Sequence, residues 1–121
     1  MTRILVVDDE KESCRFLEEF LRSKGYEVFW TASSQEAVQL VEHERPHLVL
    51  LDIRMPDRDG LSILSDIKGI DREIGVIMVT AVKEEKIAKE AMKRGADGYI
   101  TKPIDLEYLE TNILVKRILQ Q

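Results

Sequence analysis

The stretch Ile4-Leu5-Val6-Val7-Asp8-Asp9 is a short apolar run that ends in two adjacent carboxylates. Three further runs have the same form: Leu48–Leu51 before Asp52, Val76–Val79 before Thr80, and Tyr99-Ile100 before Thr101, Lys102 and Pro103. Runs rich in Val, Ile and Leu without polar alternation are typical of strands buried on both faces, as in parallel sheets. Because parallel strands end at the same sheet edge, we expect three carboxylates, a hydroxyl and an ammonium to converge there.

Five segments with helical spacing of apolar residues alternate with the strands. Their apolar faces are Phe16, Leu17, Phe20 and Leu21; Ala37, Val38, Leu40 and Val41; Leu61, Leu64 and Ile67; Ile87, Ala88, Ala91 and Met92; and Leu106, Leu109 and Ile113. Glycines are expected to end the first, third and fourth helices at Gly25, Gly69 and Gly95.

Two capping patterns and one more strand complete the order of elements. Ser33 and Glu36 have the spacing of a capping box, and Asp105 is placed to cap the last helix. A strand at Val28–Trp30 lies between the first two helices. Strict alternation of strands and helices predicts an α/β fold, a doubly wound, flavodoxin-like (βα)5 unit with parallel strand order 2-1-3-4-5 and helices on both faces.

In this strand order the winding reverses between the first and third strands, and ligands of open α/β sheets bind at such a point. Asp8, Asp9 and Asp52 leave those two strands. Neighbouring carboxylates require protons or a cation, and oxygen ligands favour a hard cation such as Mg²⁺. One carboxylate could instead accept a phosphoryl group covalently, with Lys102 and Thr80 supplying charge and a hydrogen bond.

Length and composition predict one domain over residues 1–121 and narrow the class of protein. The single cysteine, Cys14, leaves no internal disulfide, so we interpret it as structural and expect a cytoplasmic protein. The net charge of −5 argues against direct nucleic-acid binding by this domain. No apolar stretch approaches the roughly 20 residues of a membrane span, and we expect neither a signal peptide nor membrane attachment.

Taken together, these residues resemble the receiver domain of two-component response regulators. The resemblance extends over essentially the whole chain, and its motifs are Asp8-Asp9, Leu51–Pro56 followed by Asp59-Gly60, Thr80-Ala81 and Lys102-Pro103. It implies a switch rather than an enzyme acting on a separate substrate. The domain would take a phosphoryl group from a sensor histidine kinase or a phosphotransfer protein, catalysing its own phosphorylation and a slow dephosphorylation.

The resemblance assigns the acceptor role to Asp52 and a Mg²⁺ ion, with Mn²⁺ as an alternative, to the acidic residues. Asp9 would be the main metal ligand and Asp8 would act largely through water. Asp52 and the backbone carbonyl of Arg54 would complete the ligands from the protein. The same likeness implies slow loss of the phosphoryl group, because neither Arg54 nor Val82 carries a carboxylate or amide suited to orienting the attacking water.

The resemblance also implies a conformational switch that transmits phosphorylation of Asp52 to another face of the domain. Thr80, followed by Ala81, would bond the phosphoryl oxygen, and Lys102 would pair with that group. The Lys102–Pro103 bond would be cis. Tyr99 would turn inward as Thr80 moves, and the face made by the fourth helix, fifth strand and fifth helix would contact an output domain or partner protein.

The last helix carries a second apolar side besides its core stripe. Its members are Tyr108, Leu114, Val115, Ile118 and Leu119. A helix that is apolar on more than one face usually has a further covering partner. A frayed end, a homodimer contact and the start of a linker to an output domain all remain open.

Two other functions compete with the receiver interpretation. A haloacid-dehalogenase-type phosphatase also uses a strand-end aspartate, but it requires a second aspartate two residues later, where this chain has Arg54. A receiver-like interaction module that is never phosphorylated would lack an acid or the lysine, and this chain lacks neither. A nucleotide-binding protein would need a glycine-rich phosphate loop, which is not present.

Overall fold

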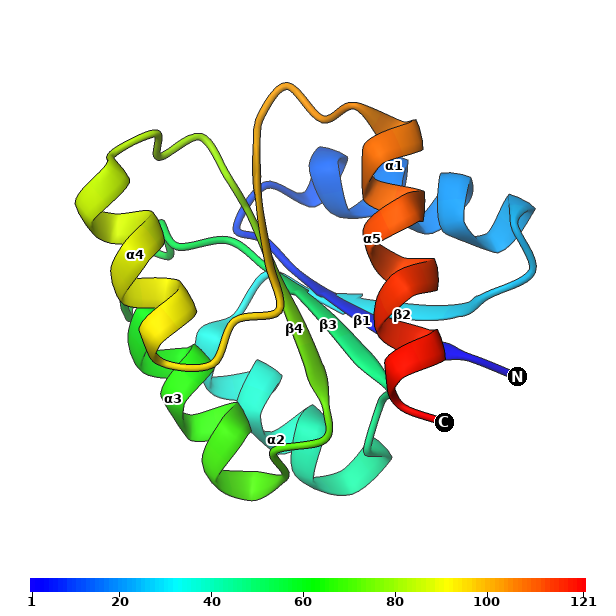
Figure 1. The fold of residues 1–121 in the computed structure, drawn as a ribbon, viewed down its shortest axis with the longest axis horizontal. Coiled ribbons are helices and arrows are strands. Elements are labelled where there is room, and N and C mark those ends of the chain that lie inside the picture. Colours follow the sequence, from blue (N-terminus) through cyan, green and yellow to red (C-terminus); the bar gives the residue numbers. More distant parts are fainter.

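The computed structural model describes residues 1–121, in which a five-stranded parallel sheet is covered by helices on both faces (Figure 1). The strands are β1 (Arg3–Val7), β2 (Glu27–Thr31), β3 (Leu48–Leu51), β4 (Gly75–Thr80) and β5 (Gly98–Thr101). The helices are α1 (Lys11–Ser23), α2 (Ser34–Glu44), α3 (Gly60–Ile70), α4 (Glu85–Lys93) and α5 (Leu106–Leu119). The order β2-β1-β3-β4-β5 confirms the predicted topology.

Successive residues of each strand point to opposite faces, and this alternation divides the core in two. Leu5 and Val7 pack in the cluster beneath α2, α3 and α4, whereas Ile4 and Val6 pack in the cluster beneath α1 and α5. Figure 1 shows these two groups of helices on opposite sides of the sheet. The apolar runs lack polar alternation because both faces of the strands are covered.

Two of the predicted helix faces and one predicted helix end are wrong in detail. Phe16 is 53% exposed, because the core stripe of α1 consists of Cys14, Leu17 and Leu21. Met92 is 50% exposed for the same reason, since its neighbour Ala91 is the buried residue. Gly69 does not end α3, which continues to Ile70.

The other predicted helix signals are confirmed. Ser33 accepts a hydrogen bond from the backbone N–H of Glu36, and Asp105 caps α5. Gly25 and Gly95 have φ values of 92° and 103°, in the left-handed region that favours glycine. The second apolar side of α5 is exposed over Tyr108, Leu114, Val115, Ile118 and Leu119. No helix combines the length and apolar character needed to cross a membrane.

Candidate functional site

The carboxyl edge of the sheet brings Asp8, Asp52 and Lys102 into direct contact. Lys102 Nζ lies 2.6 Å from Asp8 Oδ2 and 3.1 Å from Asp52 Oδ2. Asp8 directly follows β1, Asp52 follows β3 and Lys102 follows β5, so three strand ends supply the three groups. Asp8 and Asp52 are buried, with 2% and 5% of their surface exposed. One ammonium therefore bridges two buried carboxylates at the point where the winding reverses.

Each of these carboxylates divides its two oxygens between the backbone and the lysine. Asp8 Oδ1 accepts from the Glu10 N–H at 3.0 Å, and Asp52 Oδ1 accepts from the Arg54 N–H at 3.1 Å. The Oδ2 atoms of both face Lys102. This arrangement fixes both carboxylates in orientation, because each is held at two points.

The electrostatics of the pair follow from burial and hydrogen bonding. Burial raises the pKa of Asp8 above its ordinary value, and the hydrogen bonds from Lys102 and the Glu10 N–H only partly offset this. Burial by itself would lower the pKa of Lys102, but its hydrogen bonds to Asp8 and Asp52 outweigh that effect and raise it. Lys102 is therefore a permanent cation at this edge.

A group of carboxylates lies at the end of β1. Asp8, Asp9 and Glu10 can each place one carboxylate oxygen within 4.8 Å of the others, with Asp8 buried and the other two exposed. Sequence reasoning missed Glu10, although it directly follows the predicted pair. A set of oxygen donors, one buried and two facing solvent, fits a hard divalent cation that retains water. Asp52 lies outside this group of three and is linked to Asp8 through Lys102.

The loop after Asp52 is held against the sheet by close backbone packing. Asp59 caps α3 by accepting from the Leu61 N–H at 2.9 Å, and the Gly60 N–H donates to the Ile53 carbonyl at 2.8 Å. A Cβ atom on Gly60 would lie 2.3 Å from the Asp52 carbonyl oxygen. Only glycine permits this approach, so the start of α3 sets the backbone position of Asp52.

The backbone of Val82 joins Thr80 to Tyr99. Thr80 is fully buried, and its Oγ1 accepts from the Val82 N–H at 3.3 Å. The Tyr99 hydroxyl donates to the Val82 carbonyl at 2.7 Å. The two residues that resemble a switch pair therefore contact the backbone of the same residue: Thr80 of β4 meets the Val82 N–H, and Tyr99 of β5 meets the Val82 carbonyl.

The remaining predicted positions differ in exposure. Ala81 and Arg54 are exposed, whereas Val82 is 6% exposed and packs in the core. The Lys102–Pro103 peptide bond is cis, as the resemblance implied. The N–H of Lys102 donates to the Thr80 carbonyl at 2.8 Å, which continues the pairing of β5 with β4 up to the site.

Cys14 is buried beneath the site, and its Sγ donates to the Asp8 carbonyl at 3.3 Å. Burial, followed by the charge of Asp8, raises its pKa to about 11. A thiol with so high a pKa is a poor nucleophile at neutral pH. The interpretation of Cys14 as a structural residue is confirmed.

Comparison with known proteins assigns the family. Residues 4–114 match the response regulator receiver domain. Regulatory protein AtoC of Escherichia coli strain K12 is 38% identical over 99% of this chain, and sporulation initiation phosphotransferase F of Bacillus subtilis strain 168 is 39% identical over 87%. The chain belongs to the response regulator receiver domain family, and its function is that of a phosphoacceptor receiver in two-component signalling.

Solved structures agree in fold, and the relatives differ in length. A CheY-like response regulator receiver domain protein from Methanospirillum hungatei JF-1 matches with a TM-score of 0.96 and 32% identity, over 99% of this chain and 96% of that one. A CheX-CheY-BeF3-Mg²⁺ complex from Borrelia burgdorferi matches with a TM-score of 0.87 and 32% identity, over 94% and 87%. The chain spans 26% of the length of AtoC and 85% of that of phosphotransferase F.

Proposed function

We propose that Asp52 is the phosphoacceptor and that the donor is a histidine kinase or a phosphotransfer protein. The observation that carries this proposal is Lys102 Nζ, held 3.1 Å from Asp52 Oδ2 and 2.6 Å from Asp8 Oδ2. A buried carboxylate beside a fixed ammonium is placed to receive a negatively charged group, because the cation can pair with the phosphoryl oxygens that arrive. The relative named as a phosphotransferase supports a role in phosphoryl transfer.

The reaction makes one bond and breaks another. An Asp52 carboxylate oxygen forms the new P–O bond while the P–N bond to the donor histidine breaks and its electron pair stays on nitrogen. Lys102 exchanges its contact with the carboxylate for a phosphoryl oxygen. Thr80 turns its hydroxyl from Val82 toward the same group and donates a hydrogen bond to it.

We propose that Asp8, Asp9 and Asp52, with the backbone carbonyl of Arg54, hold a Mg²⁺ ion, for which Mn²⁺ is an alternative. The carboxylate of Glu10 lies in the same group as Asp8 and Asp9 and adds a further oxygen. The bound ion supplies positive charge that offsets the phosphoryl oxygens. The Borrelia burgdorferi complex, whose structure contains Mg²⁺ and BeF3, supports Mg²⁺ as the ion.

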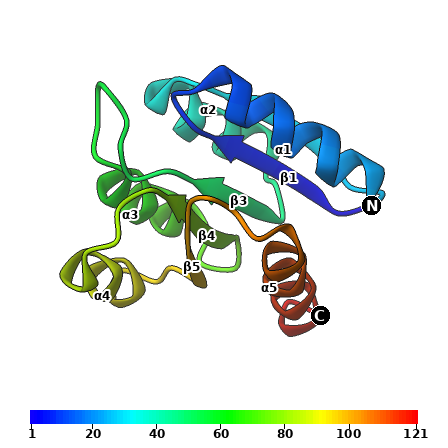
Figure 2. The same ribbon diagram turned by 90° about the horizontal axis from the view of Figure 1, so that it is seen from above.

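The switch would use the backbone of Val82, which both Thr80 and Tyr99 contact. When Thr80 turns toward the phosphoryl group it releases the Val82 N–H, and the loop that Tyr99 contacts through the Val82 carbonyl can repack. Only a packing that binds the phosphoryl group better gains population. Figure 2 shows β5 between α4 and α5, so this α4-β5-α5 face would carry the change to an output domain or partner protein.

The wider assignments complete the proposal. Residues 1–121 would form one receiver domain, and an output domain would lie elsewhere in a longer protein, in line with the greater length of AtoC. The exposed apolar side of α5 would either lead into a linker to that output domain or form a homodimer contact. Dephosphorylation would be slow, because neither Arg54 nor the buried Val82 carries a carboxylate or amide suited to orienting the attacking water.

The test is incubation with acetyl phosphate and Mg²⁺, followed by intact mass spectrometry. We expect one added phosphoryl group in the wild type, and no addition in Asp52→Asn or in excess chelator. A phosphatase would instead release inorganic phosphate continuously without a persistent adduct. A module that is never phosphorylated would give neither adduct nor turnover. An adduct that survives in Asp52→Asn would contradict the assignment of the acceptor.

A further inference from the structure

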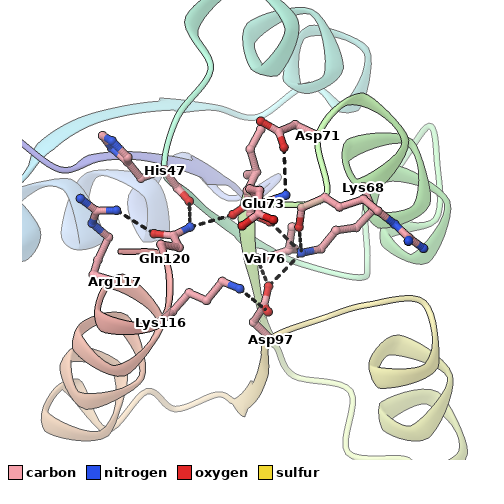
Figure 3. A network of polar contacts seen from close by, with 11 residues as sticks. His47, Lys68, Asp71, Glu73, Val76, Asp97, Lys116, Arg117 and Gln120 are labelled. Carbon is pink, nitrogen blue, oxygen red and sulfur yellow. Dashed lines mark hydrogen bonds and ion pairs between the residues drawn. The ribbon is translucent and has the colours of Figure 1, made fainter.

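The edge strand β5 is secured at both ends by pairs of lysine and carboxylate groups. It has only four residues, Gly98–Thr101, and it pairs with β4 alone. Lys102 follows its carboxyl end and holds the two site carboxylates. Asp97 precedes its amino end and pairs with Lys68 and Lys116 (Figure 3). A strand with one neighbour has few backbone hydrogen bonds, so these end contacts matter for its position.

The Asp97 carboxylate links the sheet to both helical layers. Its Oδ2 accepts from Lys68 Nζ at 3.0 Å and from the Val76 N–H at 2.8 Å, and its Oδ1 accepts from Lys116 Nζ at 2.9 Å. Its own N–H donates to the Val76 carbonyl at 2.7 Å. Lys68 belongs to α3 and Lys116 to α5, which cover opposite faces. The carboxylate thus holds, from three directions, the residue that directly precedes the first β4–β5 pair, Ile77 and Gly98.

The three charged side chains are largely buried, and each forms an ion pair. Lys68, Lys116 and Asp97 are 12%, 18% and 21% exposed. Burial alone would raise the pKa of Asp97, but hydrogen bonds from Lys116, from the Val76 N–H and from Lys68 outweigh it and lower the pKa. The carboxylate therefore stays charged, and such charge-assisted bonds are stronger than neutral ones.

One partner of Asp97, Lys68, is itself held by neighbouring backbone, as Figure 3 shows. Lys68 Nζ also donates to the Ile74 carbonyl at 2.7 Å. Gln120, the residue that caps the carboxyl end of α5, follows Lys116 by one turn, and its Nε2 donates to the carbonyls of His47 and Glu73, both at 2.9 Å. The amino end of β5 is thus joined to a hydrogen-bond network that includes the residues just before β3 and β4 and the carboxyl end of α5. It is the fixed end of the strand.

We propose that Asp97 is a positioning residue that sets β5 against β4 and thereby places Tyr99 and Lys102. The inference deepens the proposed function and rests on it for the role of Lys102. Phosphorylation would change the partners of Lys102 and leave those of Asp97 intact. The carboxyl end of β5 would therefore move while the amino end stays, and the strand would turn about Asp97.

The test compares wild type with Asp97→Asn, which keeps the shape of the side chain and removes its charge. We expect phosphorylation by acetyl phosphate to slow about tenfold, because misplacement of a reacting group by about 1 Å can cost up to about 100-fold. The NMR signals of the Tyr99 ring in the unphosphorylated protein should also shift. A purely structural role would lower only the free energy of unfolding. Val41→Ala is the control, since Val41 is a buried α2 residue remote from β5.

The outcomes separate the inference from the function on which it rests. If the wild type takes no phosphoryl group, the proposed function fails. The shift of the Tyr99 NMR signals in Asp97→Asn still shows whether Asp97 positions β5. Wild-type rate and wild-type Tyr99 signals in Asp97→Asn would overturn the inference, as would both changes appearing in Val41→Ala. If Asp97→Asn does not fold, Lys116→Met removes one partner and decides by the same two measurements: changes in the same direction support the inference, and none overturns it.

Discussion

Gly60→Ala tests whether the start of α3 sets the position of the phosphoacceptor. The added Cβ would lie 2.3 Å from the Asp52 carbonyl oxygen and 2.6 Å from Ile53 Cα. Both are backbone atoms, so no side chain can rotate away to relieve the contact. The loop that carries Asp52 and the first turn of α3 must therefore separate.

The size of the effect follows from these distances. Carbon and oxygen atoms in ordinary contact lie well over 3 Å apart, so the backbone must move by about 1 Å. Overpacking of this kind costs about 1–3 kcal/mol of the free energy of unfolding. Displacement of a reacting group by about 1 Å can slow its reaction by up to about 100-fold. We expect both losses in the same variant, because the carbonyl group that is displaced belongs to Asp52 itself.

Two measurements and a matched control check this prediction. Urea unfolding gives the free energy, and phosphorylation by acetyl phosphate with Mg²⁺ gives the rate by intact mass. Gly69→Ala makes the same substitution in the same helix, where a Cβ would meet nothing within 4 Å. That control should gain about 0.5–1 kcal/mol in stability and phosphorylate normally. Wild-type stability and rate in Gly60→Ala would refute the reasoning.

Three further predictions follow from single contacts. His47 Nδ1 accepts from the Arg3 N–H, and burial, followed by nearby cations, lowers the pKa of His47. The stabilisation from this neutral imidazole should be complete above about pH 6.5 and fall as the pH drops toward the lowered pKa. In urea unfolding, His47→Gln should make this fall in the free energy of unfolding smaller. Tyr99→Phe should lose about 1 kcal/mol with the bond to the Val82 carbonyl, and an unchanged unfolding midpoint would contradict that bond. Cys14, with its pKa raised to about 11, should react with a thiol reagent at neutral pH only on unfolding; fast labelling of the native protein would show otherwise.

Local patterns were enough to predict the elements and their order. Leu48–Leu51 reads as a buried strand because both of its faces are covered, and Gly25 and Gly95 end helices because their backbone requires positive φ. The predictions for Phe16 and Gly69 are wrong for a physical reason. Spacing alone does not say which neighbouring residue of a broad apolar face meets the sheet, and a helix tolerates glycine near its end when its other residues are packed.

The sequence by itself determined the fold class, the strand ends that meet and the residue types found there. Periodicity and strand-end chemistry are short-range properties, and the right-handed crossover leaves few ways to connect such elements. The sequence placed Lys102 at the same sheet edge as the carboxylates, but only the tertiary structure decided which atoms form bonds there and which partners Asp97 finds. Lys102 contacts Asp8, which lies 94 residues earlier in the sequence. Asp97 pairs with lysines from two helices on opposite faces of the sheet. Such contacts depend on how buried charges find counter-charges once the layers pack, and no local pattern encodes that choice.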